Sequence, residues 1–155
     1  MNAITIRKAI PSDLPRLLEL EQALIEAERS YDPTIQPPPI RYYDLEAMLA
    51  NPDLLLLVAE EESSIIGTGY TRINPAKPFL SHEKQAYFGF MYVIPDHRGK
   101  GINGMIMAGL KDWVRSRGIT ECRLDVYVPN TTALRAYEKM GFSPYSLEMR
   151  MGLDS

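Results

Sequence analysis

The residues best suited to chemistry form a glycine-rich run, Arg98–Gly104, in the second half of the chain. A β-branched and aromatic stretch precedes this run and an amphipathic stretch follows it, which predicts a strand, a tight turn and a helix. Glycines let the backbone turn sharply and let a ligand approach it closely. The first N–H groups of a helix carry partial positive charge and lack internal partners. The run therefore predicts a site for a phosphate-bearing ligand, to which His97 adds a basic side chain.

Other interpretations of this run remain open at this point. A solvated turn needs only glycines that permit packing. Gly99, Gly101 and Gly104 also match the dinucleotide fingerprint G-x-G-x-x-G, with Asp125 near the place of a ribose-binding acid. That fingerprint normally opens a domain and is followed by two βαβ halves, so we regard the match as accidental. A Walker P-loop needs Ser or Thr after its lysine, whereas Gly101 follows the lysine here.

A second constellation lies downstream and joins Asn130 to Tyr137. Seven residues of helix place both side chains on one face, about 10 Å apart along the axis, so that one extended ligand could touch both. A tyrosine is protonated at neutral pH and can give its proton to a leaving group. The alternatives are that Asn130 is only a helix N-cap and that Tyr137 is only a packing aromatic.

Patterning predicts the elements that must position these residues. Strands are expected at Ala3–Lys8, Leu54–Glu60, Ile65–Ile73, Ala86–Ile94, Cys122–Val128 and Tyr145–Met151. Helices are expected after a cap at Ser12 and at Tyr42–Ala50, Gly101–Arg117 and Asn130–Met140. The order predicts an α+β protein with a mixed, mostly antiparallel central sheet and helices on both faces, in one domain over residues 1–155.

Composition excludes several other classes of protein. The chain has 155 residues, with 17 basic and 20 acidic side chains and a net charge of −3, which disfavours a general nucleic-acid surface. The longest apolar run, Leu54–Ala59, is far too short for a membrane span. The single cysteine, Cys122, cannot form an internal disulfide, and a cytoplasmic location is expected. No Cys/His cluster is present, so no metal is expected.

The two constellations together resemble the GNAT superfamily of N-acetyltransferases. Arg98-Gly99-Lys100-Gly101-Ile102 fits the coenzyme A loop of that family, although Asn103 stands where Gly or Ala is usual. Asn130-x-x-Ala133-x-x-x-Tyr137-x-x-x-Gly141-Phe142 is similar to its second motif. The resemblance is specific over Ala86–Phe142.

The resemblance implies acetyl-CoA as co-substrate, bound between two parallel strands that splay apart near Val93 and Val128. The pyrophosphate would rest on the N–H groups of Arg98, Gly99, Lys100, Gly101, Ile102, Asn103 and Gly104. The pantetheine arm would pair with the backbone of Met91, Tyr92 and Val93. Asn130 would hydrogen-bond the arm, and Tyr137 would face the sulfur as the general acid.

The same resemblance implies a glutamate base on the central strand, but the aligned residue is Gly89. Three other residues are candidates for the base. Glu83 is the first choice and lies in the preceding loop with His82, and Glu28 lies at the end of the first helix. Aromatic and acidic residues are available to line a site for a cationic amine: Tyr31, Asp32, Tyr42, Tyr43, Tyr70, Tyr87 and Phe90.

The function expected is an acyl-CoA-dependent N-acetyltransferase that moves an acetyl group to a primary amine by direct transfer. Because Gly89 replaces the usual base, the alternative is a non-catalytic acyl-CoA sensor or regulatory module. The expected partners are acetyl-CoA and an amine acceptor, without nucleic acid or membrane. A homodimer could form through Tyr145–Met151, since relatives often pair through their C-terminal strands.

Overall fold

The computed structural model describes residues 3–154. The strands are β1 (Ile4–Lys8), β2 (Leu54–Glu61), β3 (Ser64–Pro75), β4 (Lys84–Val93) and β5 (Cys122–Arg123). The α-helices are α1 (Leu14–Glu28), α2 (Leu45–Ala50), α3 (Ile102–Ser116) and α4 (Thr131–Lys139), and short 3₁₀ turns lie at Pro11–Asp13 and Pro95–His97. The chain divides into two compact units, Met1–Asp125 and Val126–Ser155.

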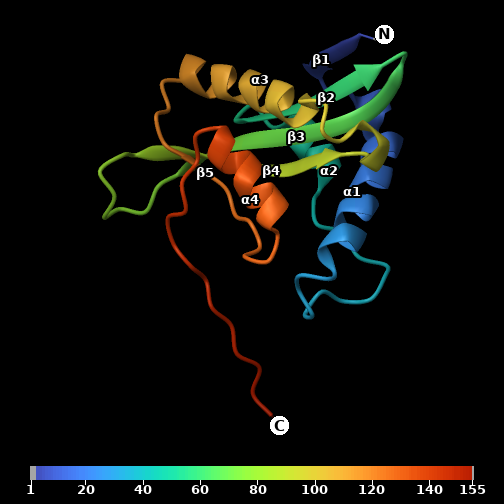
Figure 1. Cartoon of the computed structure of the whole chain (residues 1–155). Helices are drawn as coiled ribbons and strands as arrows, with labels where there is room; N and C mark the ends of the chain where they lie inside the picture. The colour runs from blue at the N-terminus through green and yellow to red at the C-terminus, as the bar shows by residue number, and fades with distance from the viewer. Residues whose placement is uncertain (1–2, 155) are drawn as a thin grey trace. The chain divides into compact units, whose positions relative to one another are not determined.

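The first unit is built on a five-stranded sheet in the order β1-β2-β3-β4-β5 (Figure 1). The pairs β1/β2, β2/β3 and β3/β4 are antiparallel, and β4/β5 is parallel. The predicted mixed, mostly antiparallel sheet is therefore confirmed. The same topology disfavours the dinucleotide interpretation, because that fingerprint belongs to parallel βαβ units.

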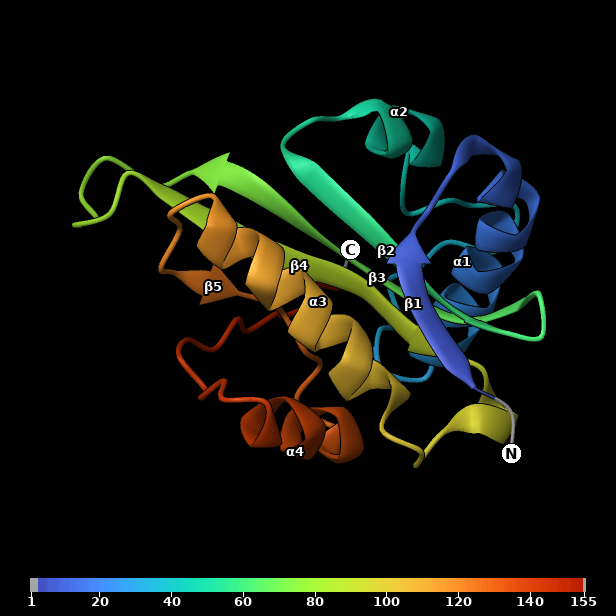
Figure 2. The same ribbon diagram turned by 90° about the horizontal axis from the view of Figure 1, so that it is seen from above.

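Helices cover both faces of this sheet, as predicted (Figure 2). On one face Leu17 and Leu20 of α1 and Leu45 of α2 are buried in a cluster with Tyr70 and Phe90. On the other face the buried side of α3 contacts the strands, since Ile106 lies within 3.0 Å of the place that a Cβ of Gly69 would occupy. Apolar residues of α3 recur at helical spacing, and their burial is what holds the helix on the sheet.

The antiparallel ladder between β3 and β4 is interrupted by a bulge. Thr68 pairs with Tyr92, but two residues later Tyr70 pairs with Gly89, so β4 has one residue more than β3 in this interval. Phe90 takes up the difference with φ of +53°, a left-handed conformation that is rare for a residue of this size. The bulge places Gly89 and Phe90, although adjacent in sequence, near the same α1/α2 face.

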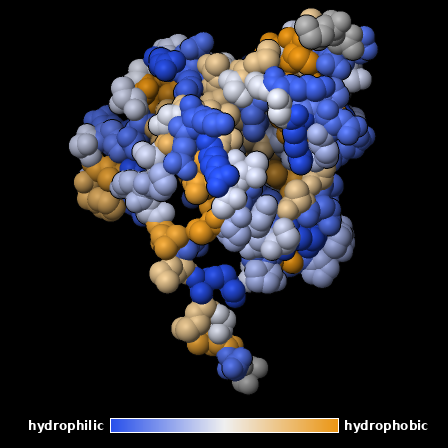
Figure 3. Space-filling model, in the orientation of Figure 1, coloured by the Kyte–Doolittle hydropathy of each residue, from blue (hydrophilic) through white to orange (hydrophobic). Residues whose placement is uncertain are grey.

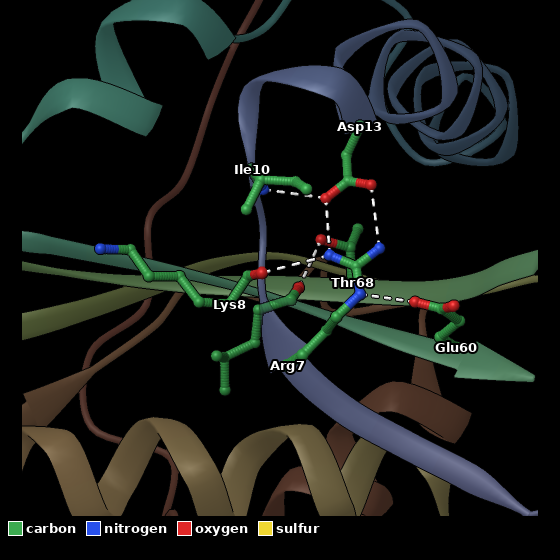
Figure 4. Close-up of polar contacts among 7 residues, drawn as sticks. Arg7, Lys8, Ile10, Asp13, Glu60 and Thr68 are labelled. Carbon is green, nitrogen blue, oxygen red and sulfur yellow. Dashed lines mark hydrogen bonds and ion pairs between the residues drawn. The ribbon is translucent and has the colours of Figure 1, made fainter. Parts of the chain in front are cut away.

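An ion-pair network fixes the start of α1 against the edge of the sheet (Figure 4). Arg7 of β1 donates two hydrogen bonds to the Asp13 carboxylate, at 2.8 and 2.9 Å, and contacts Glu60 of β2. Asp13 also accepts from the Ile10 N–H at 2.8 Å. The expectation that Ser12 caps α1 is wrong: Asp13 is the N-cap residue, and its side chain is committed to Arg7 and Ile10 rather than to the helix.

Two predicted strands differ from the structure. Of Cys122–Val128 only Cys122–Arg123 is a strand, because only those residues pair, with Ala86 and Tyr87. Tyr145–Met151 is not a strand, since it has no pairing in the structure and its large apolar side chains are exposed. Figure 3 shows the hydrophobic and hydrophilic residues that alternate along this C-terminal segment. Alternation alone cannot form a strand without a partner to hydrogen-bond.

Candidate functional site

The glycine run forms a turn between the end of β4 and the start of α3, as predicted. Gly99 and Gly101 have φ of +78° and +79°, and Gly101 is the N-cap residue of α3. A Cβ at either position would meet no atom within 4 Å. Glycine is therefore required here by backbone conformation, which strains any other residue, and not by crowding. The open space above both residues leaves the backbone accessible to a ligand.

The N-terminus of α3 supplies the donors for an anion. The first helical hydrogen bond in this region runs from Met105 N–H to the Gly101 carbonyl, at 3.1 Å. The N–H groups of Ile102, Asn103 and Gly104 precede it and have no helical partner. The N-terminus of this helix of 15 residues carries an appreciable partial positive charge. The turn thus fits a phosphate group through its main chain.

The basic side chains of the turn contribute less than the sequence indicates. Arg98 bends back, donating to the Val93 carbonyl at 2.8 Å and lying 5.3 Å from the centre of the Tyr92 ring. His97 contacts Glu61 at 3.1 Å. Lys100 is exposed. Arg98 and His97 therefore shape the turn, and the main chain with Lys100 is left to meet an anion.

Two buried polar atoms in this region lack a hydrogen-bond partner among the described residues. They are Nδ1 of His97 and Oδ1 of Asn103. An unsatisfied buried polar group is costly, and such groups are commonly satisfied by a ligand or by water. The residues of the turn therefore fit a bound polar group.

The outer edge of β4 offers main-chain groups to an extended ligand. Among the described strands, β5 pairs with β4 only at Ala86 and Tyr87, whereas β4 continues to Val93. Met91, Tyr92 and Val93 lie beyond the end of this pairing. A ligand could add to this part of the edge in the manner of another strand. Because β5 ends at Arg123, the separation of two parallel strands near Val93 and Val128 stays a prediction.

Gly89, where the resemblance implies a base, lies against the ring of Tyr70. A Cβ at residue 89 would lie 2.7 Å from Cε1 and 2.8 Å from the hydroxyl oxygen of Tyr70. Tyr70 is 4% exposed, so its ring has little room to move away. A side chain at residue 89 would therefore force the buried ring of Tyr70, which faces it from β3, to shift.

Aromatic rings extend from this point toward α2. The Tyr43 ring centre lies 5.7 Å from that of Tyr70, 4.9 Å from that of Phe90 and 5.8 Å from that of Tyr42. A cavity of about 320 Å³ opens beside these tyrosines. It is lined by Tyr42, Tyr43, Asp44, Ala47, Met48, Asn51, Leu54, Tyr70 and Arg72. The aromatic residues predicted for an acceptor site are thus partly brought together.

Burial controls the protonation of these phenols. It raises the pKa of Tyr43, Tyr70 and Tyr87 above the ordinary tyrosine value. Nearby negative groups raise the pKa of Tyr87 further, since its hydroxyl donates to Asp125 at 2.9 Å and Glu28 is within electrostatic reach. All three phenols are therefore protonated at neutral pH and can donate hydrogen bonds.

The reserve candidates for the base lie in different places. Glu83 is exposed at the end of the β3–β4 loop, and the extended chain from it to Gly89 spans about 20 Å. His82 lies beside it and contacts Gln85 at 2.8 Å. Glu28 is half-buried at the end of α1 and is the one of the three whose charge acts on both Tyr43 and Tyr87.

The second unit holds the other predicted site residues. Asn130 is the N-cap of α4, and its side-chain oxygen accepts from the Ala133 N–H at 3.2 Å. Tyr137 is half-buried on α4, with its ring 6.1 Å from that of Phe142. The chain turns back at Gly141, whose φ is +105°. The capping role weighed for Asn130 is confirmed, and the catalytic role of Tyr137 stays a prediction.

Features that could indicate other chemistry are few. Burial raises the pKa of the Cys122 thiol, which disfavours a reactive thiolate. Among residues 3–154 no three His, Cys, Asp or Glu side chains are grouped to hold a metal ion. No helix in that range is long and apolar enough to cross a membrane.

Comparison with known proteins identifies the family. Residues 19–142 match the family described as "Acetyltransferase (GNAT) family". The match covers both the glycine turn and α4. The chain belongs to the GNAT acetyltransferase family, which confirms the resemblance drawn from the two motifs.

Curated relatives share part of the sequence. The protein named uncharacterized N-acetyltransferase YhfO, of Bacillus subtilis, is 29% identical over 98 residues, which are 63% of this chain and 64% of that one. A streptothricin acetyltransferase of Streptomyces lavendulae is 43% identical over 51 residues, 33% of this chain and 27% of that protein. The chain thus spans less than two thirds of the length of these relatives.

Solved structures share the fold over nearly the whole chain. The glucosamine-6-phosphate N-acetyltransferase of Arabidopsis thaliana superposes with a TM-score of 0.72 and 26% identity, covering 98% of this chain and 99% of that one. A predicted acetyltransferase of Clostridium acetobutylicum, solved with acetyl-CoA, gives 0.75 at 22% identity, covering 97% and 96%.

Sequence reasoning missed the role of Tyr70. The sequence places Tyr70 among several aromatic residues for an acceptor site and does not indicate its contact with Gly89. A glycine within an aromatic strand signals a bulge or a close approach. That signal does not indicate which residue approaches the glycine, because the approaching residue depends on the register between β3 and β4.

Proposed function

We propose that the protein is an acetyl-CoA-dependent N-acetyltransferase that moves an acetyl group from acetyl-CoA to a primary amine by direct transfer. The observation that carries the proposal is the turn at Gly99 and Gly101, whose left-handed residues open onto the N-terminus of α3. Membership of the GNAT family supports it.

The co-substrate would be held mainly by main-chain groups. The N–H groups of Arg98–Gly104 would bind the pyrophosphate at the helix start. The edge of β4 at Met91, Tyr92 and Val93, beyond its pairing with β5, would receive the pantetheine arm. Asn130 would hydrogen-bond that arm while its side-chain oxygen also caps α4, since an amide can donate and accept at once.

The transfer needs one proton donor and one proton acceptor. The amine nitrogen attacks the thioester carbonyl, a C–N bond forms and the C–S bond breaks. The departing thiolate takes a proton, for which Tyr137 is the proposed general acid. The attacking nitrogen must lose a proton, and a base that accepts it is needed because an alkylamine is mostly protonated at neutral pH.

The remaining features of the proposal concern the setting of the enzyme. A single domain over residues 1–155, a cytoplasmic location and a homodimer through Tyr145–Met151 stay predictions. The exposed apolar side chains of that segment favour an additional partner for it. No metal takes part in the proposed reaction.

The experiment measures CoA release from acetyl-CoA with a panel of primary amines, alongside calorimetric binding of CoA. We expect binding and amine-dependent turnover, and we expect Tyr137→Phe to lower kcat by about 10²–10⁴-fold. Tyr145→Phe, an exposed tyrosine in the same unit, is the matched control and should not change kcat. Binding of CoA without any turnover would favour the alternative function, a non-catalytic sensor. The observation that supports this alternative is the absence of a base at Gly89. No binding of CoA at millimolar concentration would refute both functions.

A further inference from the structure

Helix α1 contacts β4 on the face of the sheet where Tyr70 and Phe90 are buried. Glu28 is the last residue of this helix and is half-buried. It shares a hydrogen bond with Tyr42, and its charge acts on Tyr43 and on Tyr87 of β4. A carboxylate therefore lies on the face of the sheet onto which Tyr70 and Gly89 open.

We propose that Glu28 is the base that accepts the proton of the attacking amine, in place of the carboxylate that is missing at residue 89. This inference rests on the proposed acetyl transfer. It names the residue that removes the proton from the amine, a step to which no residue has yet been assigned.

The position of the reacting carbon follows from the chain direction. The anion-binding turn comes directly after Val93, so an arm that starts there and follows the edge of β4 runs back toward Gly89. Val93 and Gly89 are separated by about 13 Å of extended strand. The acyl group at the end of the arm would then arrive beside Gly89, where Glu28 and the tyrosines face the sheet.

The other titratable groups at this place are less suited to accept a proton. The phenols of Tyr43, Tyr70 and Tyr87 are protonated, because burial raises the pKa of each. Asp125 is exposed and already accepts the Tyr87 hydroxyl. Glu21 is fully buried and already accepts from the N–H groups of Tyr42 and Tyr43. Asp32 accepts from the Thr34 N–H. Glu28 is the half-buried carboxylate whose charge acts on both Tyr43 and Tyr87.

The surroundings of Glu28 tune its basicity. Burial raises the pKa of its carboxyl, and the charge of Asp32 raises it further, whereas the hydrogen bond with Tyr42 lowers it. The result is a pKa above the ordinary glutamate value. A base becomes more effective as its pKa approaches the working pH, provided that it remains ionised there. The neighbouring Arg29 donates to Glu26, at 2.8 Å, and to the Gln36 carbonyl, and its buried Nη2 has no partner among the described residues.

The proton path is then balanced. Glu28 takes one proton from the ammonium form of the acceptor, and the neutral nitrogen attacks the thioester carbon. As the C–S bond breaks, the sulfur takes one proton from the general acid, and the nitrogen, which brought two protons into the attack, gives one of them back to that acid. The products are the amide and the free thiol of CoA, and Glu28 releases its proton to solvent afterwards.

The test compares two amines of similar size, ethylamine and 2,2,2-trifluoroethylamine, at neutral pH. Ethylamine is protonated there and needs a base, whereas trifluoroethylamine is already neutral. We expect Glu28→Gln to lower kcat/KM for ethylamine by about 10²–10⁴-fold. With trifluoroethylamine the loss should be at least tenfold smaller. Calorimetric affinity for CoA and the thermal midpoint should stay unchanged.

Glu26→Gln is the matched control, since Glu26 is an exposed carboxylate on the same helix. It should leave kcat/KM for both amines unchanged. If Glu28→Gln lowers kcat/KM by the same factor with both amines, or leaves kcat/KM unchanged, Glu28 is not the base. The transferase function would still stand in either case. If the wild-type protein acetylates neither these amines nor any amine of the panel, the proposed function fails and the role of Glu28 fails with it.

Discussion

The ring of Tyr70 occupies the space that a side chain at residue 89 would need. Its Cε1 lies 2.7 Å from the place of a Cβ on Gly89, and the two residues face each other in register across β3 and β4. The strand position at which a base is expected is thus closed by a neighbouring tyrosine. The two residues form a complementary pair, and a change at either one should be felt at the other.

Gly89→Ala tests this pair through stability. The added methyl group must displace a buried ring, and overpacking of this kind costs about 1–3 kcal/mol of the free energy of unfolding. The measurement is urea unfolding of the wild type, Gly89→Ala, Tyr70→Leu and the double variant. We expect the cost in the double variant to be at least about 1 kcal/mol smaller than the sum of the single costs. Additive costs would show that the two residues do not interact.

The glycine turn gives a second test, because its glycines differ in conformation. Gly101 has φ of +79°, so Gly101→Ala should lower the free energy of unfolding by about 1–2 kcal/mol. Gly104 lies in the first turn of α3 with open space around it, and Gly104→Ala should stabilise by up to about 1 kcal/mol. Opposite signs in urea unfolding are the expected result. Destabilisation by Gly104→Ala as large as that by Gly101→Ala would contradict the conformational argument.

Local sequence features predicted this turn well, and the reason is physical. A left-handed glycine before an amphipathic helix is determined by residues within one short segment, as is the β2–β3 hairpin. The contact between Tyr70 and Gly89 depends on the register of two long strands and on the bulge at Phe90, so no local pattern contains it. The segment Tyr145–Met151 shows the same limit, because its alternation meets no pairing strand.

The hydrogen bond between Tyr42 and Glu28 predicts a pH effect. This bond favours the ionised carboxylate and lowers the pKa of Glu28. Tyr42→Phe removes it, so the pKa of Glu28 should rise and the acid limb of the kcat/KM profile for ethylamine should move to higher pH. The measurement is that profile for the variant, the wild type and Tyr145→Phe. An acid limb that stays in place or moves to lower pH would show that it does not report the protonation of Glu28.

The ion pair between Arg7 and Asp13 predicts how acid affects stability. The bond to Arg7 lowers the pKa of Asp13, so its contribution is complete above the unfolded pKa of about 3.9 and is lost as the pH falls through the lower folded value. Because the Asp13 side chain is 8% exposed, Asp13→Asn should cost about 1.5–3 kcal/mol at pH 7. That cost should shrink as the pH falls below about 4, because the unfolded wild-type chain then binds a proton at Asp13 that folding must release. Asp112→Asn, which breaks an exposed pair with Arg115, should cost less than about 1 kcal/mol. Urea unfolding at pH 7 and at a pH below 4 measures these differences. A cost for Asp13→Asn that is small at pH 7, or that does not change with pH, would show that the pair does not hold α1 to the sheet.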